Sequence, residues 1–433
     1  MKTATSKYKV LALGFGGQIL NSLRENFESI FSISNDDTAD LNWDMLHLMR
    51  QQVSAPEISF EMMECMNSVM MSYARFSDIN SRRFYYLNGR DSETYNSLIL
   101  TFYILYKIIT EKKINLILYQ NIPHEGFDYV VYLISQHLRI KSVICHQSLF
   151  PNRFWLAQSI ENFGKFKLNP KLFEVNYTDY ELPKEWFYMR GSNLDFSYKL
   201  SDLILEVFSR PYRAVPAIIR YIYAQEYRSN VRKLTQKKTI SERYIYFPLH
   251  LQPELTTSAL GGVYADQALA IESLSAFLPD NLLIYVKENP KQTEKQRDKF
   301  FYKRLSSLKN VKLIDARENS INLIEGSLGV ATITGTAGWE ALFLGKPVLI
   351  FGFAWYREFG GVTKFQLPFD FNEFINNKPP DNRLLSRELS DKITTAGVGI
   401  VDSGHQLEIK NFDEKVNARS VAESICRYIQ FIF

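Results

Sequence analysis

The sequence predicts an α/β fold of doubly wound parallel sheets, divided into an N-terminal domain at 1–238 and a C-terminal domain at 239–433. Short apolar runs alternate with helical patterns in both parts, and this alternation is regular after residue 244. Glycine-rich or polar loops follow several of the runs, as they do in βα units. At 433 residues the chain is long enough for two or three domains with cores of their own.

Composition narrows the class of protein. Hydrophobic residues make up 46% of the chain, and Lys and Arg are spread along it with a net charge of +4. These values indicate a globular protein and argue against a nucleic-acid partner. Cys65, Cys145 and Cys426 lie far apart without CxxC spacing, which predicts neither disulfides nor a metal site and fits a reducing, cytoplasmic compartment.

The apolar runs are too short for a membrane-spanning helix, which needs about 20 such residues. The basic and apolar stretch CRYIQFIF at the C-terminal end could touch a bilayer surface, but we expect it to pack on its own domain. The predicted protein is cytoplasmic, with peripheral association at the inner face of the cytoplasmic membrane as a further option.

The first predicted strand, Lys9–Leu13, leads into a glycine-rich turn and a helix. Three glycines shape this turn: Gly14, Gly16 and Gly17. The spacing approaches that of a dinucleotide-binding turn, but Ile19 stands where a third glycine is required. Asp36 and Asp37 follow at about the distance of a ribose-binding acid. We expect this turn to let an acceptor or a cofactor approach the backbone.

A helical stretch at 40–110 precedes a βαβ unit. Its methionines have the spacing of an apolar helix face: Met62, Met63, Met66, Met70 and Met71. Strands are expected at 114–119 and 141–145, and polar side chains follow both: His124, Glu125, His146 and Gln147. Carboxyl ends of parallel strands share an edge of the sheet, so these groups are expected to converge. Alternatively, His124 and Glu125 merely begin a helix, with Glu125 favouring its dipole.

A basic helical stretch at 221–238 separates the two halves. It follows a connecting region at 151–213 that is rich in aromatic residues, Asn and Pro. A charge run of this kind is by default a solvated helix, so we place the domain boundary at its end.

The C-terminal half repeats the βα unit regularly. Strands are expected at 244–247, 282–286 and Val311–Ile314, with helices at 266–277, before 308 and at 320–327. The stretch VATITGTAGWEALFLGKPVLIF at 330–351 adds a strand, a glycine-rich turn, a helix and a second strand. This alternation predicts a parallel sheet covered on both faces by helices.

Four loops of this half are expected to end strands on one edge of the sheet. Two of them are PLHLQPE, with His250, and KENPKQ, with Lys287, Glu288, Asn289 and Pro290. The others are Asp315-Ala316-Arg317 and TGTAGWE, with Thr334, Gly335, Thr336, Ala337 and Glu340. Backbone N–H groups and Lys287 suit a phosphate, and Glu340 suits ribose hydroxyls, so a nucleotide site is predicted. For the TGT turn alone, close packing is an equally good explanation.

These motifs resemble the bacterial capsule and lipopolysaccharide polysaccharide-biosynthesis glycosyltransferases, especially the β-Kdo transferases. The resemblance rests on TGTAGWEALFLGKPVLIFG, KENP, PLHLQPE and NIPHEG, and is strongest at 244–353. It implies a GT-B architecture, in which two Rossmann-like domains face each other across a cleft. The C-terminal domain would hold a sugar nucleotide, with Lys287 to Pro290 and Thr334 to Thr336 at its phosphate, and the N-terminal domain would hold the acceptor.

The resemblance further implies CMP-Kdo as donor, a bacterial surface polysaccharide or glycolipid as acceptor, and a retaining reaction started by a carboxylate. We expect Glu125 to be this carboxylate, with His124 and His250 for proton transfer or for binding the donor carboxylate. Asp195 and Asp202 are alternative nucleophiles. Five residues are assigned to the acceptor side: Gly14, Gly16, Gly17, His146 and Gln147.

One position departs from the family, because many relatives have His where Asn289 stands before Pro290. An amide donates hydrogen bonds but carries no proton charge, so this position is expected to bind phosphate and not to transfer protons. A Walker lysine and a paired-aspartate metal site are also missing. This disfavours Mg²⁺-dependent phosphoryl transfer and predicts a metal-independent enzyme without a cofactor.

Three alternatives stay open. The same fold could use another donor, such as a different nonulosonic acid, a UDP- or GDP-sugar or a CDP-polyol. An NAD-dependent oxidoreductase would bind its cofactor at the turn with Gly16, so Gly16→Val would abolish NAD binding. A non-catalytic assembly partner would bind the nucleotide without turning over the donor.

Overall fold

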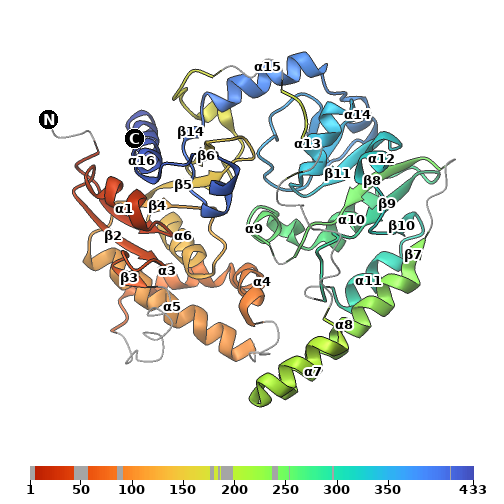
Figure 1. Cartoon of the computed structure of the whole chain (residues 1–433), viewed down its shortest axis with the longest axis horizontal. Coiled ribbons are helices and arrows are strands. Elements are labelled where there is room, and N and C mark those ends of the chain that lie inside the picture. The colour runs from red at the N-terminus through yellow and green to blue at the C-terminus, as the bar shows by residue number, and fades with distance from the viewer. Residues whose placement is uncertain are drawn as a thin grey trace. The chain divides into compact units, whose positions relative to one another are not determined.

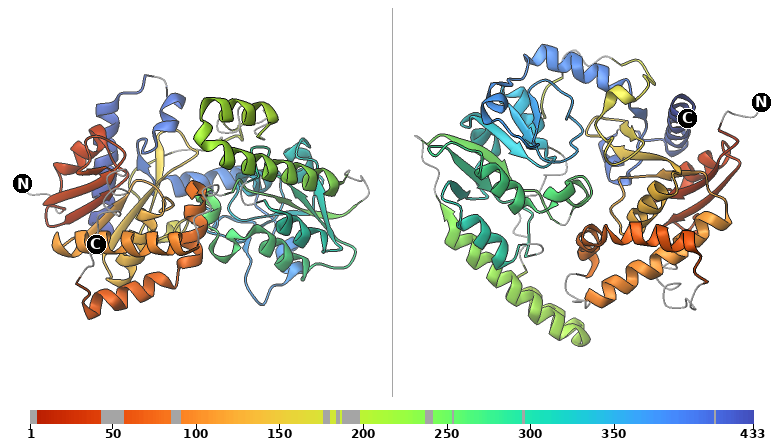
Figure 2. Two further views of the ribbon diagram at one scale, coloured as in Figure 1. Left: turned by 90° about the horizontal axis from the view of Figure 1, so that it is seen from below. Right: turned by 180° about the vertical axis from the view of Figure 1, so that it is seen from behind.

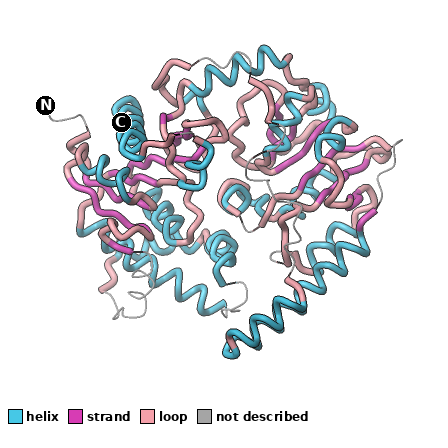
Figure 3. Tube along the Cα trace, viewed as in Figure 1, coloured by secondary structure: helices cyan, strands magenta, loops and turns pink. Residues whose placement is uncertain are grey.

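The structure is a computed structural model that describes residues 5–42, 57–84, 91–175, 180–183, 186, 198–236, 242–252, 254–294, 297–409 and 411–433. Two compact units follow from the contacts between its residues (Figure 1). Unit 1 comprises Met1–Asn80, Gly89–Tyr177 and Leu389–Phe433, and unit 2 comprises Ser81–Asn88 and Thr178–Glu388. In each unit the strands lie inside and helices lie around them (Figure 3). The predicted pair of Rossmann-like α/β units is confirmed.

The sheet of unit 1 is parallel except at one edge. In spatial order its described strands are β14 (Gly397–Val398), β6 (Arg153–Ala157), β5 (Lys141–Gln147), β4 (Leu116–Tyr119), β1 (Lys9–Leu13), β2 (Ser29–Ser34) and β3 (Leu41–Asn42). β1 to β5 pair in parallel, whereas β6 and β14 are antiparallel. The strand order reverses direction between β1 and β4, which makes this the switch point of the sheet. The predicted strands β1, β4 and β5 are confirmed, and β2, β3, β6 and β14 were not predicted.

The helices of unit 1 cover this sheet. They are α1 (Gly17–Arg24), α3 (Phe60–Met70), α4 (Tyr73–Phe84), α5 (Asp91–Glu111), α6 (Phe127–His137) and α16 (Glu414–Ile432), with the 3-10 helices η1 (Phe166–Leu168) and η5 (Ser403–Glu408). α1 and α16 lie side by side and share a core with β1, β4 and β5 (Figure 1). On α3 the buried residues are Met62, Cys65 and Val69. Met63 and Met71 are exposed, so the predicted methionine face is wrong in part.

The sheet of unit 2 is parallel throughout its described strands. In spatial order they are β13 (Val362–Lys364), β12 (Val348–Ile350), β11 (Gly329–Thr332), β8 (Tyr244–Pro248), β9 (Leu283–Lys287), β10 (Val311–Ile314) and β7 (Thr235–Gln236). Its switch point lies between β8 and β11. The strands predicted from the regular alternation are confirmed to within about two residues, the usual uncertainty of strand and helix ends.

Helices cover both faces of this second sheet. They are α7 (Leu200–Ser209), α8 (Ala214–Leu234), α9 (Leu255–Ser258), α10 (Gln267–Ser275), α11 (Lys299–Ser306), α12 (Ser320–Glu325), α13 (Thr336–Phe343) and α14 (Phe371–Asn376), with η3 (Pro211–Arg213) and η4 (Gly262–Ala265). α15 (Asn382–Ile393) begins in unit 2 and ends in unit 1. On β8, Ile245 and Phe247 join a core with α10 and α11. Tyr244 and Tyr246 point the other way, because their hydroxyls bond to α12. The predicted doubly wound sheet is confirmed.

The division into units differs from the predicted boundary at residue 238, which itself lies outside the described residues. The C-terminal segment belongs to unit 1, because α16 packs on α1 and β14 pairs with β6. The segment with α7 and α8 belongs to unit 2, because α8 packs on α11 and β7 pairs with β10. These long-range contacts have no local signature in the sequence. The boundary predicted at the end of the basic helix therefore does not reflect them.

Two further expectations concern the surface and the thiols. None of the described helices is long and apolar enough to cross a membrane. The C-terminal helix α16 packs on a protein core, with Val421, Ile425 and Tyr428 buried, but this core belongs to unit 1 and not to the expected domain at 239–433. The three cysteines are buried free thiols.

Candidate active site

Four loops meet at one edge of the sheet of unit 2. β8, β9, β10 and β11 run in parallel, so their carboxyl ends lie on the same edge. The loops after β8 and β11 flank the switch point, where doubly wound sheets bind their ligands. The predicted convergence of the four loops is confirmed.

His250 connects the loops on the two sides of this switch point. Its Nε2 lies 3.0 Å from Oγ1 of Thr332 and accepts the N–H of Thr334 at 3.4 Å. An accepting Nε2 leaves the ring proton on Nδ1. Burial, with a smaller effect of Arg297, lowers the pKa of His250 to about 3. The neutral ring therefore holds the start of the TGT turn in place.

The TGT turn is packed tightly around its glycines. A Cβ on Gly335 would lie 3.0 Å from Nε2 of His250, and one on Gly338 would lie 2.3 Å from the hydroxyl oxygen of Tyr356. This hydroxyl donates a hydrogen bond to the carbonyl of Gly335. Gly335 is also the N-cap of α13, so the turn presents the N–H groups of a helix N-terminus. Close packing and anion-binding geometry therefore occur in the same five residues.

Lys287 ends β9 at this edge and is buried. Its Nζ donates to the carbonyl of Glu318 and to Oγ of Ser320, each at 2.7 Å. Burial lowers the pKa of Lys287, while the carboxylates of Glu318, Glu340 and Asp315 oppose this shift. An ammonium group has three protons, so these two bonds leave one donor for a further acceptor.

Glu340 lies on α13, close to one turn beyond the TGT turn. Nε1 of Trp186 donates to its Oε1 at 2.7 Å. Burial raises the pKa of Glu340, whereas this hydrogen bond and the charge of Lys287 lower it. Lys287, predicted to bind phosphate, and Glu340, predicted to bind ribose, therefore interact electrostatically at one edge of the sheet.

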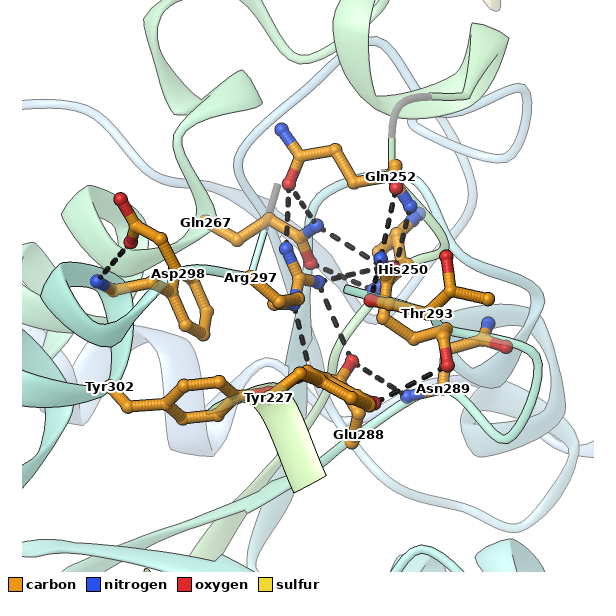
Figure 4. A network of polar contacts seen from close by, with 12 residues as sticks. Tyr227, His250, Gln252, Gln267, Glu288, Asn289, Thr293, Arg297, Asp298 and Tyr302 are labelled. Carbon is orange, nitrogen blue, oxygen red and sulfur yellow. Dashed lines mark hydrogen bonds and ion pairs between the residues drawn. The ribbon is translucent and has the colours of Figure 1, made fainter. Parts of the chain in front are cut away.

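Glu288 is engaged in a buried ion pair with Arg297. Nε of Arg297 and the hydroxyl of Tyr302 both donate to Oε2 of Glu288, at 3.0 and 2.9 Å. The other carboxylate oxygen accepts the N–H of Asn289 at 2.9 Å. Figure 4 shows the carboxylate turned toward Arg297. These contacts give Glu288 a structural role in the KENP loop, and nucleotide binding by its side chain stays a prediction.

Arg297 also ties the β9 loop to the β8 loop. Its two terminal nitrogens donate to Oε1 of Gln252 and to the carbonyl of His250, each at 3.0 Å. Gln267 adds bonds to Gln252 and to both backbone groups of His250 (Figure 4). Sequence reasoning missed Arg297, Gln252 and Gln267, because isolated polar residues outside a motif carry no signal until their contacts are known.

Asn289 and Pro290 form the partly exposed end of the KENP loop. Oδ1 of Asn289 accepts the N–H of Lys291 at 2.9 Å, which is an Asx turn. The loop therefore changes from the buried contacts of Glu288 to partial exposure at Asn289 and Pro290.

In unit 1, His124 and Glu125 form a pair directly after β4. Nε2 of His124 lies 3.3 Å from Oε1 of Glu125, and its Nδ1 lies 2.6 Å from the carbonyl of Ile122. A carbonyl only accepts, so Nδ1 carries a proton. The contact between Nε2 and the carboxylate then requires a second, shared proton. This geometry is suited to proton transfer.

Asp128 stabilises the loop that carries this pair. Its carboxylate accepts the N–H groups of His124 and Glu125 at 3.0 and 2.7 Å. Burial raises the pKa of Asp128, and the positive charge of His124 opposes this. Asp128 therefore supplies the negative charge in the first turn of α6. The side chain of Glu125 contacts His124 instead, which weakens the explanation that Glu125 merely begins the helix.

His146 lies near His124 at the same edge. Its Nδ1 is 2.7 Å from Oδ1 of Asn121. Burial, followed by the charges of His124 and His405, lowers the pKa of His146 to about 3. His405, which lies on η5, was missed because only the fold brings it to this edge. Among the described residues, no group of three or more His, Cys, Asp or Glu side chains is arranged to hold a metal ion.

Gln147 connects β5 to the C-terminal segment. Its Nε2 donates to the carbonyl of Arg153 at 2.9 Å, and its Oε1 accepts the N–H of Val401 at 2.8 Å. Its side chain is therefore occupied by structural bonds, and a direct role toward an acceptor stays a prediction.

Gly14 lies at the switch point of unit 1, where the loops after β1 and β4 meet. Its φ of +84° favours glycine, and a Cβ there would lie 2.9 Å from Oε1 of Gln120. The amide nitrogen of Gln120 in turn donates to the carbonyl of Val401. The close approach of these loops explains why this position is glycine.

Carboxylates border the rest of the glycine turn. A Cβ on Gly16 would lie 2.4 Å from Cβ and Cγ of Asp36, and one on Gly17 would lie 3.6 Å from Oε1 of Glu414. Hydrogen bonds from the side chain and the backbone of Thr38 lower the pKa of Asp36. Asp36 follows β2 and lies beside the turn, the position of a ribose-binding acid, so the oxidoreductase alternative stays a prediction. Gly16→Val would displace Asp36 in any case, so it is a poor test of NAD binding.

Comparison with known proteins agrees with the sequence motifs. Residues 201–396, most of unit 2, match the family model of capsule polysaccharide biosynthesis proteins. No curated protein matches the chain in sequence. Over these residues, the match agrees with the family that the motifs predict.

Similar solved structures are distant. The Thermosulfurimonas dismutans KpsC β-Kdo 2,7 transferase is 11% identical, with 89% of this chain and 98% of that chain covered and a TM-score of 0.34. The β-Kdo 2,4 transferase of the same KpsC is 12% identical, with coverages of 66% and 94% and a TM-score of 0.29. The UDP-GlcNAc 2-epimerase of Methanocaldococcus jannaschii is 13% identical, with coverages of 98% and 99% and a TM-score of 0.25.

Proposed function

We propose that this chain is a glycosyltransferase that moves Kdo from CMP-Kdo, with retention, onto a polysaccharide or glycolipid of the bacterial surface. The family match at 201–396 supports a role in capsule polysaccharide biosynthesis. The resemblance of the KENP and TGT motifs to β-Kdo transferases supports the donor. Both motifs lie on the edge of unit 2 where a doubly wound sheet binds ligands.

The observation that carries this proposal is the placement of Lys287, Glu340 and the N-terminus of α13 at one sheet edge. The N–H groups of the TGT turn and the remaining proton of Lys287 bind the phosphate of CMP. Glu340 accepts hydrogen bonds from the ribose hydroxyls. We assign His250 to positioning the turn, because its neutral ring accepts the N–H of Thr334.

The chemistry is assigned to His124 and Glu125 of unit 1. In a retaining transfer, a carboxylate attacks the anomeric carbon as CMP leaves, and the acceptor hydroxyl then displaces the carboxylate. Glu125 is the proposed nucleophile. The proton shared between Nε2 of His124 and Glu125 passes to the phosphate of the leaving CMP, and the neutral Nε2 then takes the proton of the acceptor hydroxyl. The 3.3 Å contact between these side chains supports the pairing.

Release of CMP from CMP-Kdo in the presence of a capsule-type acceptor tests the proposal. We expect Glu125→Gln to reduce turnover at least about 100-fold while CMP binding is unchanged, because the substitution removes a reacting group and leaves unit 2 intact. The chain could instead turn over a UDP-sugar, a GDP-sugar, a CDP-polyol or another nonulosonic acid, and not CMP-Kdo. That result would assign a different donor and leave the fold assignment unchanged. Binding without turnover of any donor would favour the assembly partner.

A further inference from the structure

The helices α7 and α8 of unit 2 carry an exposed apolar face. α7 has no buried residue, although it is rich in Leu, Ile, Val and Phe. Its side chains are 72% exposed at Leu205 and 82% exposed at Phe208. Further exposed apolar residues of the pair are Leu200, Ile204, Tyr212, Val215, Ile218 and Ile222. Surfaces of soluble proteins rarely expose so many adjacent large apolar side chains.

Helical spacing gathers these side chains on one side of each helix. On α7, Ile204 and Phe208 are four residues apart and Leu200 precedes them by four. On α8, Val215, Ile218 and Ile222 follow the same rule. The two helices lie side by side (Figure 2). Together they form what we call the α7–α8 face: Leu200, Ile204, Leu205, Phe208, Tyr212, Val215, Ile218 and Ile222.

The two acidic residues of α7 bond to the residues directly before the helix and not to the α7–α8 face. Glu206 accepts the hydroxyl of Tyr198 at 2.7 Å. Arg220 of α8 lies over the ring of Tyr198 at 4.1 Å and pairs with Glu294. Asp202 accepts the N–H of Lys199 at the start of α7. These bonds orient α7 with its acidic residues away from the exposed apolar side.

The segment at 199–234 is also where the net charge of the chain resides. It contains seven Lys and Arg but three Asp and Glu, an excess equal to the +4 of the whole chain. The rest of the chain is therefore neutral in sum. Arg210 lies between Phe208 and Tyr212 at the connection of the two helices and is exposed. Exposed apolar and aromatic side chains beside cations are typical of a helix that lies in a lipid headgroup region.

We propose that the α7–α8 face binds the surface of an anionic lipid bilayer. Phe208, Tyr212 and the adjacent aliphatic side chains enter the interface, and the exposed guanidinium group of Arg210 beside them pairs with a lipid phosphate. A second copy of this chain fits the face less well, because a symmetric contact would bring two segments of the same positive charge together. This inference does not depend on the identity of the donor, since it uses no residue of the candidate active site.

Co-sedimentation with vesicles tests the proposal. The chain should bind vesicles of phosphatidylcholine that contain about 30% phosphatidylglycerol, and it should bind pure phosphatidylcholine at least about tenfold more weakly, because basic segments are attracted to anionic lipids. Phe208→Asp and Arg210→Glu should each reduce binding to the anionic vesicles at least about fivefold. Leu384→Asp is the matched control, because Leu384 on α15 is 51% exposed and lies outside the α7–α8 face. It should bind like the unchanged protein.

Two further measurements keep the result interpretable. CMP binding and the melting temperature should be the same in Phe208→Asp as in the unchanged chain, because the substituted side chain makes no core contact. Equal vesicle binding by Phe208→Asp, or no binding by the unchanged chain, would overturn the proposal. A dimer of the unchanged chain that becomes a monomer in Phe208→Asp would also overturn it and assign the face to self-association.

Discussion

At the scale of single residues, the site combines side chains that a motif reveals with side chains that only the fold reveals. Lys287 and Glu340 were predicted because each belongs to a short motif at a strand end. Arg297, which is fully buried and bonds both loops, could not be predicted. Its partners lie up to 47 residues away in the chain, and no spacing rule connects them.

Replacement of Lys287 tests the phosphate assignment. Lys287→Ala should weaken CMP binding at least about tenfold, because a charged hydrogen bond to phosphate is lost. Lys346→Ala is the control: Lys346 is also partly buried and bonds a carbonyl, that of Ser327, but lies at the opposite edge of the sheet before β12. Isothermal titration should show unchanged CMP affinity for this control. Equal losses in both variants would contradict the assignment.

Replacement of Arg297 tests the buried network. Arg297→Met leaves Glu288 buried without its cation, so the free energy of unfolding should fall by about 3–5 kcal/mol. The double variant Arg297→Met/Glu288→Leu should recover part of this loss, because no unpaired charge remains. Urea denaturation measures both. Arg317→Met removes an exposed ion pair with Asp315 and should leave stability unchanged; a similar loss there would show that burial is not the cause.

At the scale of elements, strands and helices were predicted well where apolar periodicity is local. β8 to β12 follow from short apolar runs between polar loops, and the shared edge follows from parallel pairing. Six of the described strands were missed: β2, β3, β6, β7, β13 and β14. Of these, β3, β7, β13 and β14 are short edge strands, which depend on a neighbour that the sequence does not identify. β2 and β6 are longer inner strands that were not recognised. The packing of the TGT turn could not be predicted either, because Tyr356, which bonds to this turn, follows β12 in the chain.

A methyl group at Gly338 tests the packing of this turn. Gly338→Ala would place a Cβ 2.3 Å from the Tyr356 hydroxyl, so the turn must shift. We expect a melting temperature lower by several degrees and weaker CMP binding, because the N–H groups of α13 are displaced. Gly404→Ala, where the new methyl meets only Oδ1 of Asp402 at 3.3 Å, should change neither. If Gly338→Ala bound CMP with unchanged affinity, the TGT turn would not be part of the nucleotide site.

At the scale of the whole chain, each unit contains a histidine that folding keeps neutral. His146 in unit 1 and His250 in unit 2 have pKa values of about 3 in the fold against 6.5 for an ordinary histidine. The unfolded chain therefore binds more protons below pH 6.5, and stability falls as pH decreases from 6.5 toward 3.

The division into units was the least predictable feature, because α16 returns to unit 1 after unit 2 is complete.

Acid should therefore destabilise both units. Between pH 7 and pH 5 each of these histidines should reduce the free energy of unfolding by about 2 kcal/mol. His250→Asn should reduce this pH dependence, although it also loses stability at pH 7. Denaturant unfolding at the two pH values measures the difference. A pH dependence that is the same in the variant would show that His250 takes up its proton without unfolding.

We predict that unit 2 binds a cytidine sugar nucleotide through Lys287 and the TGT turn. Calorimetric titration of CMP, UDP, GDP and NAD into the unchanged chain and into Lys287→Ala tests it most directly. We predict that CMP binds more tightly than the other three ligands and that Lys287→Ala loses at least about tenfold of that affinity. Binding of NAD alone, or CMP binding that Lys287→Ala leaves unchanged, would contradict it.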